Sequence, residues 1–299
     1  KKLTPLDAAL ARKAYVEALE ATFHAGRLAS GRGTREVAEA ARDAPAPPTP
    51  PQPVDLLLDG LVTRFTHGYE ASVPTLQRAL EALRSDDTRA DDDNRRWLWL
   101  ACHVAAMLWD DETIYVLANR ATRLARETGA LTTLPTALNA LASVLVLTGE
   151  LSRASELLAE EDAITRATGA PPLPNARLTL ASWRGLQPET SELHATMVHG
   201  ATERGEGATV GMAEVSLAYL HNGLGNYDDA LAAAAHVYES DDFSYSSVAL
   251  PELIEAAVRA GQPERAAVAL ERLTSRANAS GTPQALGLAA RSRAITLTG

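Results

Sequence analysis

Paired aspartates are the residues whose spacing comes nearest to metal chemistry. Some all-helical enzymes hold magnesium with an Asp-Asp-x-x-Asp array. Here no acidic pair is followed by a third acid at the required offset; the pairs begin at Asp86, Asp91, Asp110, Asp228 and Asp241. The run 85–94 holds five aspartates, but it lacks the glycine and the final glutamate of a calcium loop. This pattern favours a solvated acidic loop over a cation site.

Histidine and cysteine give no further reaction chemistry. His194 and His199 lie five residues apart, which turns them about 140° from each other on a helix and argues against shared metal ligation. The single cysteine, Cys102, rules out an internal disulfide and a cysteine-cluster metal site. The chain also lacks the phosphate-loop, dinucleotide, zinc-protease and serine-hydrolase motifs. We therefore expect no catalytic residues, no cofactor and no metal.

The charge balance argues against nucleic acid as a direct partner of this chain. Asp and Glu number 38 against 28 Lys and Arg, which gives a net charge of -10. Binding to DNA needs clustered positive charge, and the arginines here are scattered among acids. The chain contains no apolar run of the roughly 20 residues that a membrane span needs, and its first residues do not resemble a signal peptide. We expect a cytoplasmic protein without membrane contact.

The elements that must position any site are predicted to be helices. Aromatic residues make up only 5% of the chain, whereas alanine and leucine, which favour helices, are abundant. Residues 4–29 suit a helix that Thr4 caps and Pro5 opens, and 34–42 suit a second one. The chain is then divided into an N-terminal helical segment, 1–43, a proline-rich linker, 44–53, and a repeat domain, 54–299.

A regular spacing of turns organises the third segment. Sharp turns interrupt amphipathic stretches at Gly68, Asp110, Gly149, about Gln187, Gly225 and Gly261. Each turn has a helical pattern before and after it, so the sequence predicts about six helical hairpins in an α-solenoid. A further helix, 284–296, has no partner before the sequence ends. This orphan helix indicates either a fragment of a longer protein or a terminal cap.

Small residues on both sides of these turns resemble those of tetratricopeptide repeats, where the two helices of a hairpin cross closely. Ala142 with Ala154 and Ala218 with Ala230 are small on both sides of the turn; the third matching pair is Ile254 with Ala266, of which only Ala266 is small. The other three hairpins match poorly. The resemblance implies a concave groove lined by the first helices, which would bind a protein or a small-molecule effector. The polar residues assigned to this groove are Asn139, Ser143, Arg177, Arg184, Tyr219, Asn222 and Glu255.

Several short stretches are similar to one family in particular. They are residues 5–12, 25–29, 35–42, 55–61 and 284–294. Together they resemble the helical-repeat region of the large ATP-binding LuxR-type transcriptional regulators, many of which activate secondary-metabolite gene clusters such as polyketide antibiotic pathways. The resemblance implies a nucleotide-binding domain before this chain and a DNA-binding helix-turn-helix domain after it. ATP hydrolysis and DNA binding would then belong to those domains.

The sequence favours two functions, and an all-α enzyme is a third, less favoured one. In the first, the chain is the regulatory interaction module of a LuxR-type activator. In the second, it is a free-standing tetratricopeptide adaptor that binds a peptide or a small ligand in its groove. The orphan helix favours the first, because an adaptor should end in a complete repeat or a capping helix. An incomplete last repeat would also expose an apolar face on which a second copy could dock to form a homodimer.

Overall fold

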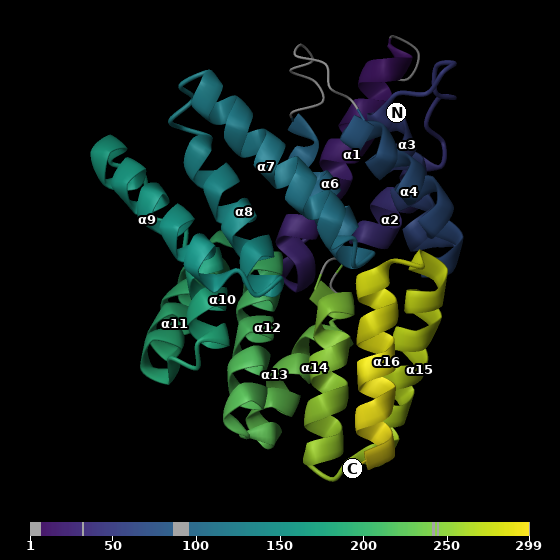
Figure 1. The fold of residues 1–299 in the computed structure, drawn as a ribbon. Coiled ribbons are helices and arrows are strands. Elements are labelled where there is room, and N and C mark those ends of the chain that lie inside the picture. Colours follow the sequence, from purple (N-terminus) through teal and green to yellow (C-terminus); the bar gives the residue numbers. More distant parts are fainter. Residues whose placement is uncertain (1–6, 32, 86–95, 241–242, 244, 299) are drawn as a thin grey trace.

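The computed structural model describes residues 7–31, 33–85, 96–240, 243 and 245–298 of the chain. Within these ranges all regular secondary structure is helical, which confirms the predicted all-α class (Figure 1). None of the helices in the described part combines the length and apolar character required to cross a membrane. The acidic run 85–94 lies, apart from Ser85, outside the described residues.

The N-terminal segment begins with α1 (Ala8–Ala25), followed by a 3-10 turn η1 (Gly26–Leu28) and α2 (Thr34–Ala41). The expected cap was wrong: Asp7 caps α1, and its carboxylate accepts the Leu10 N–H at 2.9 Å. Thr4 and Pro5 lie outside the described residues. A capping aspartate satisfies an N–H that has no partner within the helix. The second N-terminal helix is confirmed.

Helices follow one another as antiparallel pairs through the rest of the described chain. The pairs are α3 (Pro53–Thr66) with α4 (Tyr69–Ser85), α6 (Leu98–Met107) with α7 (Asp111–Glu127), α8 (Leu134–Leu147) with α9 (Leu151–Thr168), α10 (Asn175–Trp183) with α11 (Gln187–Arg204), α12 (Gly207–Leu224) with α13 (Tyr227–Glu239), and α14 (Tyr245–Arg259) with α15 (Pro263–Ser280). The last helix, α16 (Pro283–Thr298), packs on α14 and α15. Five of the six predicted turn residues fall between the two helices of a pair, whereas Gln187 is the first residue of α11.

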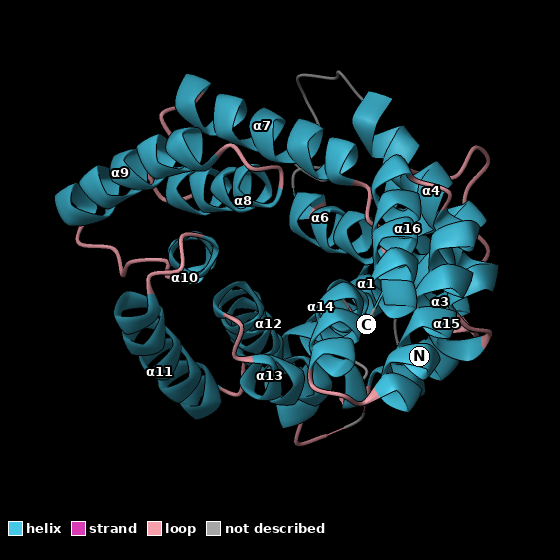
Figure 2. Cartoon of the chain, turned by 60° about the horizontal axis from the view of Figure 1, so that its bottom comes forward, coloured by secondary structure: helices cyan, strands magenta, loops and turns pink. Residues whose placement is uncertain are grey.

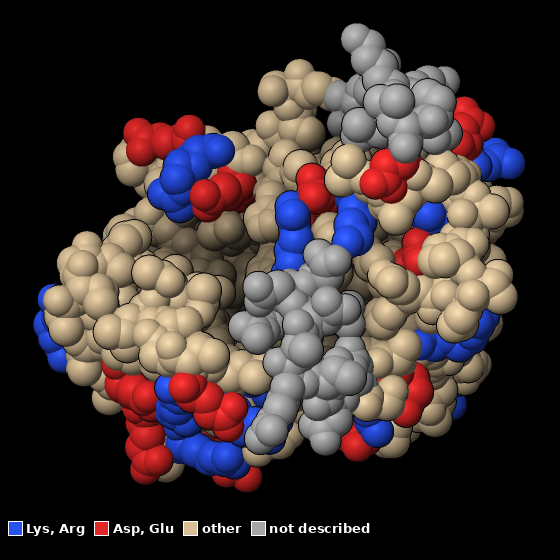
Figure 3. All heavy atoms as spheres, turned by 90° about the horizontal axis from the view of Figure 1, so that it is seen from above, with Lys and Arg blue, Asp and Glu red and all other residues tan. Residues whose placement is uncertain are grey.

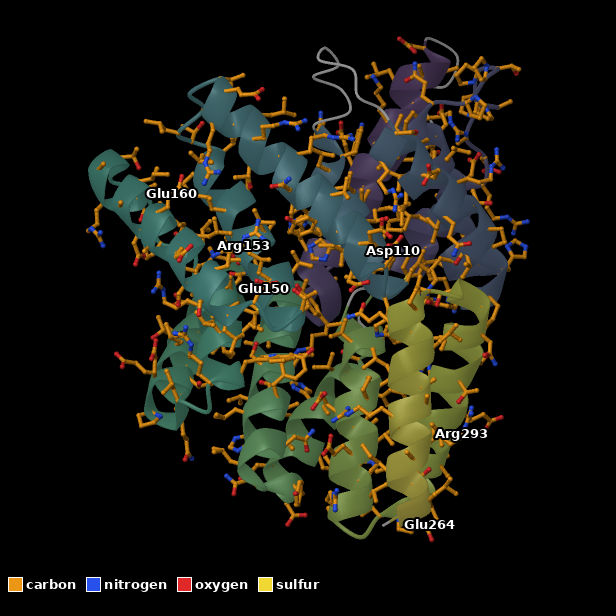
Figure 4. The ribbon with its side chains drawn as sticks, viewed as in Figure 1. Asp110, Glu150, Arg153, Glu160, Glu264 and Arg293 are labelled. Atoms are coloured by element: carbon orange, nitrogen blue, oxygen red, sulfur yellow. The ribbon has the colours of Figure 1, made fainter. Side chains whose placement is uncertain are left out.

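A residue with positive φ follows the first helix in all six of these pairs, including Gly68 with φ 104°. Gly149, Gly185, Gly225 and Gly261 have φ between 69° and 84°, which costs glycine little because it has no Cβ. Trp109 takes the same place after α6 with φ 52°. Asp110 instead caps α7, since its carboxylate accepts the Thr113 N–H at 3.0 Å (Figure 4). The turn residue is thus Trp109 rather than Asp110, and Gly185 rather than Gln187.

The pairs curve so that their first helices lie inside. Figure 2 shows α6, α8, α10, α12 and α14 on the inner side of the curve and α7, α9, α11 and α13 on the outer side. The outer helices carry exposed ion pairs, such as Arg126 with Glu160, and Arg153 of α9 donates to the Tyr115 hydroxyl at 3.3 Å (Figure 4). Figure 3, seen from above, shows a hollow beside the residues drawn in grey, with visible walls that are mostly uncharged.

The curve brings the first pair back against the last. Gln77 of α4 donates to the Ser280 carbonyl at 2.7 Å, and Ser275 of α15 donates to Glu70 at 2.7 Å. Thr282 donates to the Leu108 carbonyl at 3.2 Å. These bonds join residues more than 170 positions apart. The first helix pair is therefore in direct contact with the last one.

The N-terminal segment shares its core with the helix pairs. Residues 44–52 are not helical, as the prolines predict, but Pro53 already opens α3. Val16, Leu19 and Phe23 of α1 are buried in the same cluster as residues of α3, α4, α14 and α15. The proline-rich segment therefore connects two parts that pack directly on each other.

Replacement of Gly207 by alanine tests the contact between the end of α1 and the start of α12. A Cβ at Gly207 would meet the Ala25 carbonyl oxygen, the Arg27 nitrogen and the Leu28 nitrogen, all of them backbone atoms. We expect Gly207→Ala to lower the free energy of unfolding by about 1–3 kcal/mol, as overpacking does. Urea unfolding followed by circular dichroism measures the change.

The matched control lies in the same helix. A Cβ at Gly223 would meet no atom within 4 Å. Gly223→Ala should therefore stabilise the protein by about 0.5–1 kcal/mol through the better helix propensity of alanine. Equal effects of the two changes would contradict the close approach of η1 to α12.

Candidate ligand-binding face

Asn139 and Ser143 serve packing between helix pairs. Asn139 is 6% exposed; its amide donates to the Leu173 carbonyl at 3.0 Å and accepts from the Ala176 N–H at 3.4 Å. Ser143 donates within its own helix to the Asn139 carbonyl at 3.0 Å. Asn139 thus ties α8 to the first turn of α10. In the described structure both side chains are therefore hydrogen-bonded within the protein and present no unpaired buried polar atom to a ligand.

Arg177 and Arg184 do not face the inner side of the curve. Arg177 pairs with Asp162 of α9 at 2.7 Å, and Arg184 donates to Ser155 of α9 at 2.9 Å. Both line a shallow cavity of about 160 Å³ between α9, α10 and α11. Because the left-handed turn is Gly185 and not Gln187, the expected register was displaced by two residues. Two residues rotate a helix by about 200°, which moves these arginines to the outer side.

Tyr219 and Asn222 come together with two residues that the sequence did not single out. The Asn222 amide donates to the Glu252 carboxylate at 2.8 Å and to the Glu252 carbonyl at 3.1 Å. The Tyr219 ring lies edge-on to Trp183, with centroids 5.7 Å apart. We call Trp183, Tyr219, Asn222 and Glu252 the inner cluster. It joins the adjacent helices α10, α12 and α14 (Figure 2).

Burial shifts the pKa values of two residues in the inner cluster. Burial raises the pKa of Glu252, partly opposed by the bond from Asn222 and by the charge of Arg291. Burial and the nearby Glu252 carboxyl also raise the pKa of Tyr219, so its hydroxyl stays neutral at physiological pH. Trp183, in contrast, is 41% exposed and remains accessible to a ligand.

Glu255 is engaged by α16. Its carboxylate pairs with the guanidinium of Arg291, so it is not an open acceptor on the inner face. Arg291 lies on the polar side of α16. Other residues of the same helix, Ala285, Ala289 and Ser292, are buried against the last pair. Leu286 and Leu297 on α16 are 45% and 81% exposed.

A second group of rings lies where α1, α6 and α14 meet. His24 stacks on Trp99 with ring centroids 4.0 Å apart, and the ring centroids of Trp99 and His103 are also 4.0 Å apart. His103 also lies edge-on to Tyr245. Burial, with a smaller contribution from His24, lowers the pKa of His103 to about 4, so its imidazole is neutral at physiological pH. Recognition of Trp109 as the turn residue would have placed Trp99 and His103 on the inner face.

The histidines and the cysteine singled out in the sequence lie in separate places among the described residues. No group of three or more His, Cys, Asp or Glu among them could hold a metal ion. His194 contacts Glu214 at 3.3 Å, and His199 contacts Glu203 at 3.5 Å. Burial raises the pKa of the Cys102 thiol to about 12, which keeps it in the unreactive thiol form.

Comparison with known proteins adds no relative. No protein-family model matches the chain, and no curated protein matches it.

Proposed function

We propose that this chain is a tetratricopeptide-like interaction module whose inner face binds an effector or a partner. The single observation that carries the proposal is the inner cluster, in which an exposed tryptophan, a tyrosine and a half-buried carboxyl group meet on three adjacent first helices. Aromatic residues beside a few convergent polar groups are typical of ligand sites. In this proposal the module has no active site of its own.

The small residues at the helix crossings support the tetratricopeptide-like architecture. Ala142, Ala154, Ala218 and Ala230 are fully buried, and Ala266 is 1% exposed. Alanine at these positions lets the two helices of a pair approach closely. The antiparallel pairs and their inner first helices agree with an α-solenoid. In this one the contact between α4 and α15 joins the two ends of the curve.

We propose further that the module belongs to a cytoplasmic LuxR-type activator of a secondary-metabolite gene cluster. The support is the similarity of the stretches named above to the repeat region of those regulators. ATP and DNA would bind to domains outside these residues. In the alternative, a free-standing adaptor presents the same inner face to a peptide or small ligand. A second copy that docks on Leu286 and Leu297 of α16 is compatible with either proposal.

The coding sequence on both sides of this chain distinguishes the regulator from the adaptor. The regulator requires a nucleotide-binding domain upstream and a helix-turn-helix domain downstream in the same reading frame. A start codon beside Lys1 together with a stop codon after Gly299 would reject it and favour the adaptor.

Replacement of Trp183 by alanine tests the inner face as the signalling surface. We expect chromosomal Trp183→Ala to lower transcription of the controlled genes by about tenfold or more, as loss of a tryptophan hot spot weakens binding. Because Trp183 is partly exposed, protein abundance should stay unchanged. Quantitative transcript analysis and immunoblotting measure the two effects.

Val268→Ala on α15 is the matched control, because Val268 is 61% exposed and lies outside the inner cluster. It should leave both transcription and abundance unaltered. Normal transcription in the Trp183 variant would reject this surface as the point of signal entry.

A further inference from the structure

We propose that the inner cluster recognises a primary ammonium group. This inference rests on the proposed function, because it names the ligand chemistry of the same inner face. The first observation concerns Glu252, whose carboxylate accepts a hydrogen bond from Asn222 at 2.8 Å. Among the described residues, no Lys, Arg or His nitrogen lies within 4.0 Å of this carboxylate. The nearby Arg291 pairs with Glu255 instead.

The second observation is an acceptor without a donor. The Oδ1 atom of Asn222 is buried and has no hydrogen-bond partner in the described structure. The amide orientation is fixed by its neighbours, because a flipped amide would place Oδ1 against two oxygens of Glu252. Buried polar atoms in proteins are rarely left without a partner. A buried water, or a ligand group that enters the cluster, would supply the missing donor.

The third observation is the aromatic wall. Tyr219 lies one helical turn before Asn222 on α12, and its ring meets the exposed Trp183 edge-on. Aromatic rings attract cations through their negatively charged faces. The hydroxyl of Tyr219 makes no hydrogen bond to the described residues and adds another acceptor oxygen.

These groups match the chemistry of an ammonium ion. The carboxylate of Glu252, the amide oxygen of Asn222 and the phenol oxygen of Tyr219 are three acceptors on adjacent helices. A primary ammonium group carries three N–H donors and one positive charge. An anionic ligand would instead meet a carboxyl group and an orphaned acceptor. The source of the ammonium group is a lysine side chain of a partner or a free alkylamine.

The test uses the whole chain labelled with 5-fluorotryptophan and observed by fluorine NMR. The four tryptophans give four resonances, and Trp183→Phe assigns the one that reports on the site. The probes are n-pentylamine, the neutral n-pentanol and a Gly-Lys-Gly peptide with blocked ends. We expect the Trp183 resonance to shift with the amine or the peptide but not with the alcohol. The cationic probe that binds more tightly identifies the source of the ammonium group.

Two variants make the assignment specific. Glu252→Gln keeps an oxygen that can accept from the Asn222 amide but removes the negative charge. This variant should bind n-pentylamine about tenfold or more weakly. Glu214→Gln on α12, whose carboxylate lies 3.3 Å from His194, should leave affinity unchanged. Binding of the native protein should also weaken as the pH falls below the raised pKa of Glu252, since protonation removes its charge. Tyr219, Arg291 and Glu255 are the other titratable groups beside it.

The outcomes separate the two proposals. Equal shifts with amine and alcohol, or unchanged amine affinity in Glu252→Gln, would overturn ammonium recognition. The transcription defect of Trp183→Ala would still support the inner face as a signalling surface. Amine binding together with normal transcription in Trp183→Ala would retain the site and reject the proposed signalling role.

Discussion

Arg12→Ala should lower the free energy of unfolding by about 3–5 kcal/mol, because it leaves a buried carboxylate without its cation. Arg12 and Asp55 have side chains only 4% and 6% exposed, and their charged atoms are 2.5 Å apart. The same guanidinium donates to the Pro45 carbonyl at 2.8 Å, the Asp55 carbonyl at 3.0 Å and Asp59 at 2.6 Å. One side chain thus fastens α1, the proline-rich segment and α3. Urea unfolding with circular dichroism measures the loss.

Two further variants distinguish a lost cation from lost packing. Arg12→Leu combined with Asp55→Leu removes both charges, and it should recover much of the stability that Arg12→Ala loses. Arg96→Ala removes an ion pair with Glu17 of the same helix α1, at 2.8 Å, whose side chains are 57% and 43% exposed. This exposed pair should be worth no more than about 1 kcal/mol. A comparable loss from Arg96→Ala would show that burial does not set the strength of the Arg12 pair.

The positions of the helices could be predicted because local rules determine them. Gly149, Gly225 and Gly261 adopt the left-handed conformation that glycine tolerates best, and each ends a first helix. The register of the second pair could not be predicted in this way, since Trp109 adopts that conformation without being glycine. An error of one residue turns a helix by about 100°, enough to hide Trp99 and His103 from the inner face.

The candidate site could be predicted only where the register was right. Tyr219 and Asn222 follow from Gly225, and the structure places both in the inner cluster. Glu252 was missed because its contact with Asn222 depends on how α14 packs beside α12, which no local pattern specifies. The closure of the curve was missed for the same reason: Gln77 meets Ser280 across 203 positions. Helix propensity and turn chemistry act over a few residues, whereas curvature results from the sum of all pair-to-pair contacts.

Phe23→Ala should have an effect as large as that of Arg12→Ala, because Phe23 joins elements that are far apart in the sequence. Its ring is 5% exposed, stacks on Phe243 with centroids 4.1 Å apart and meets Phe65 at 5.5 Å. The three rings bring α1, α3 and the segment before α14 into one cluster. Truncation of a buried phenylalanine costs about 3–5 kcal/mol, through lost burial and the cavity that remains. Urea unfolding gives the total loss.

Hydrogen exchange then shows whether Phe23 joins the two ends of the curve or only stabilises its own helix. If the ring joins them, Phe23→Ala should speed amide exchange in α3 and in the first turns of α14, while α8 and α9 stay protected. Phe23→Leu, which keeps most of the apolar volume, should cost less than about 1.5 kcal/mol. Leu10→Ala, at a side chain of α1 that is 48% exposed, should leave exchange unchanged. Faster exchange confined to α1 would mean that α1 packs on the helix pairs but does not stabilise the contact between the two ends of the curve.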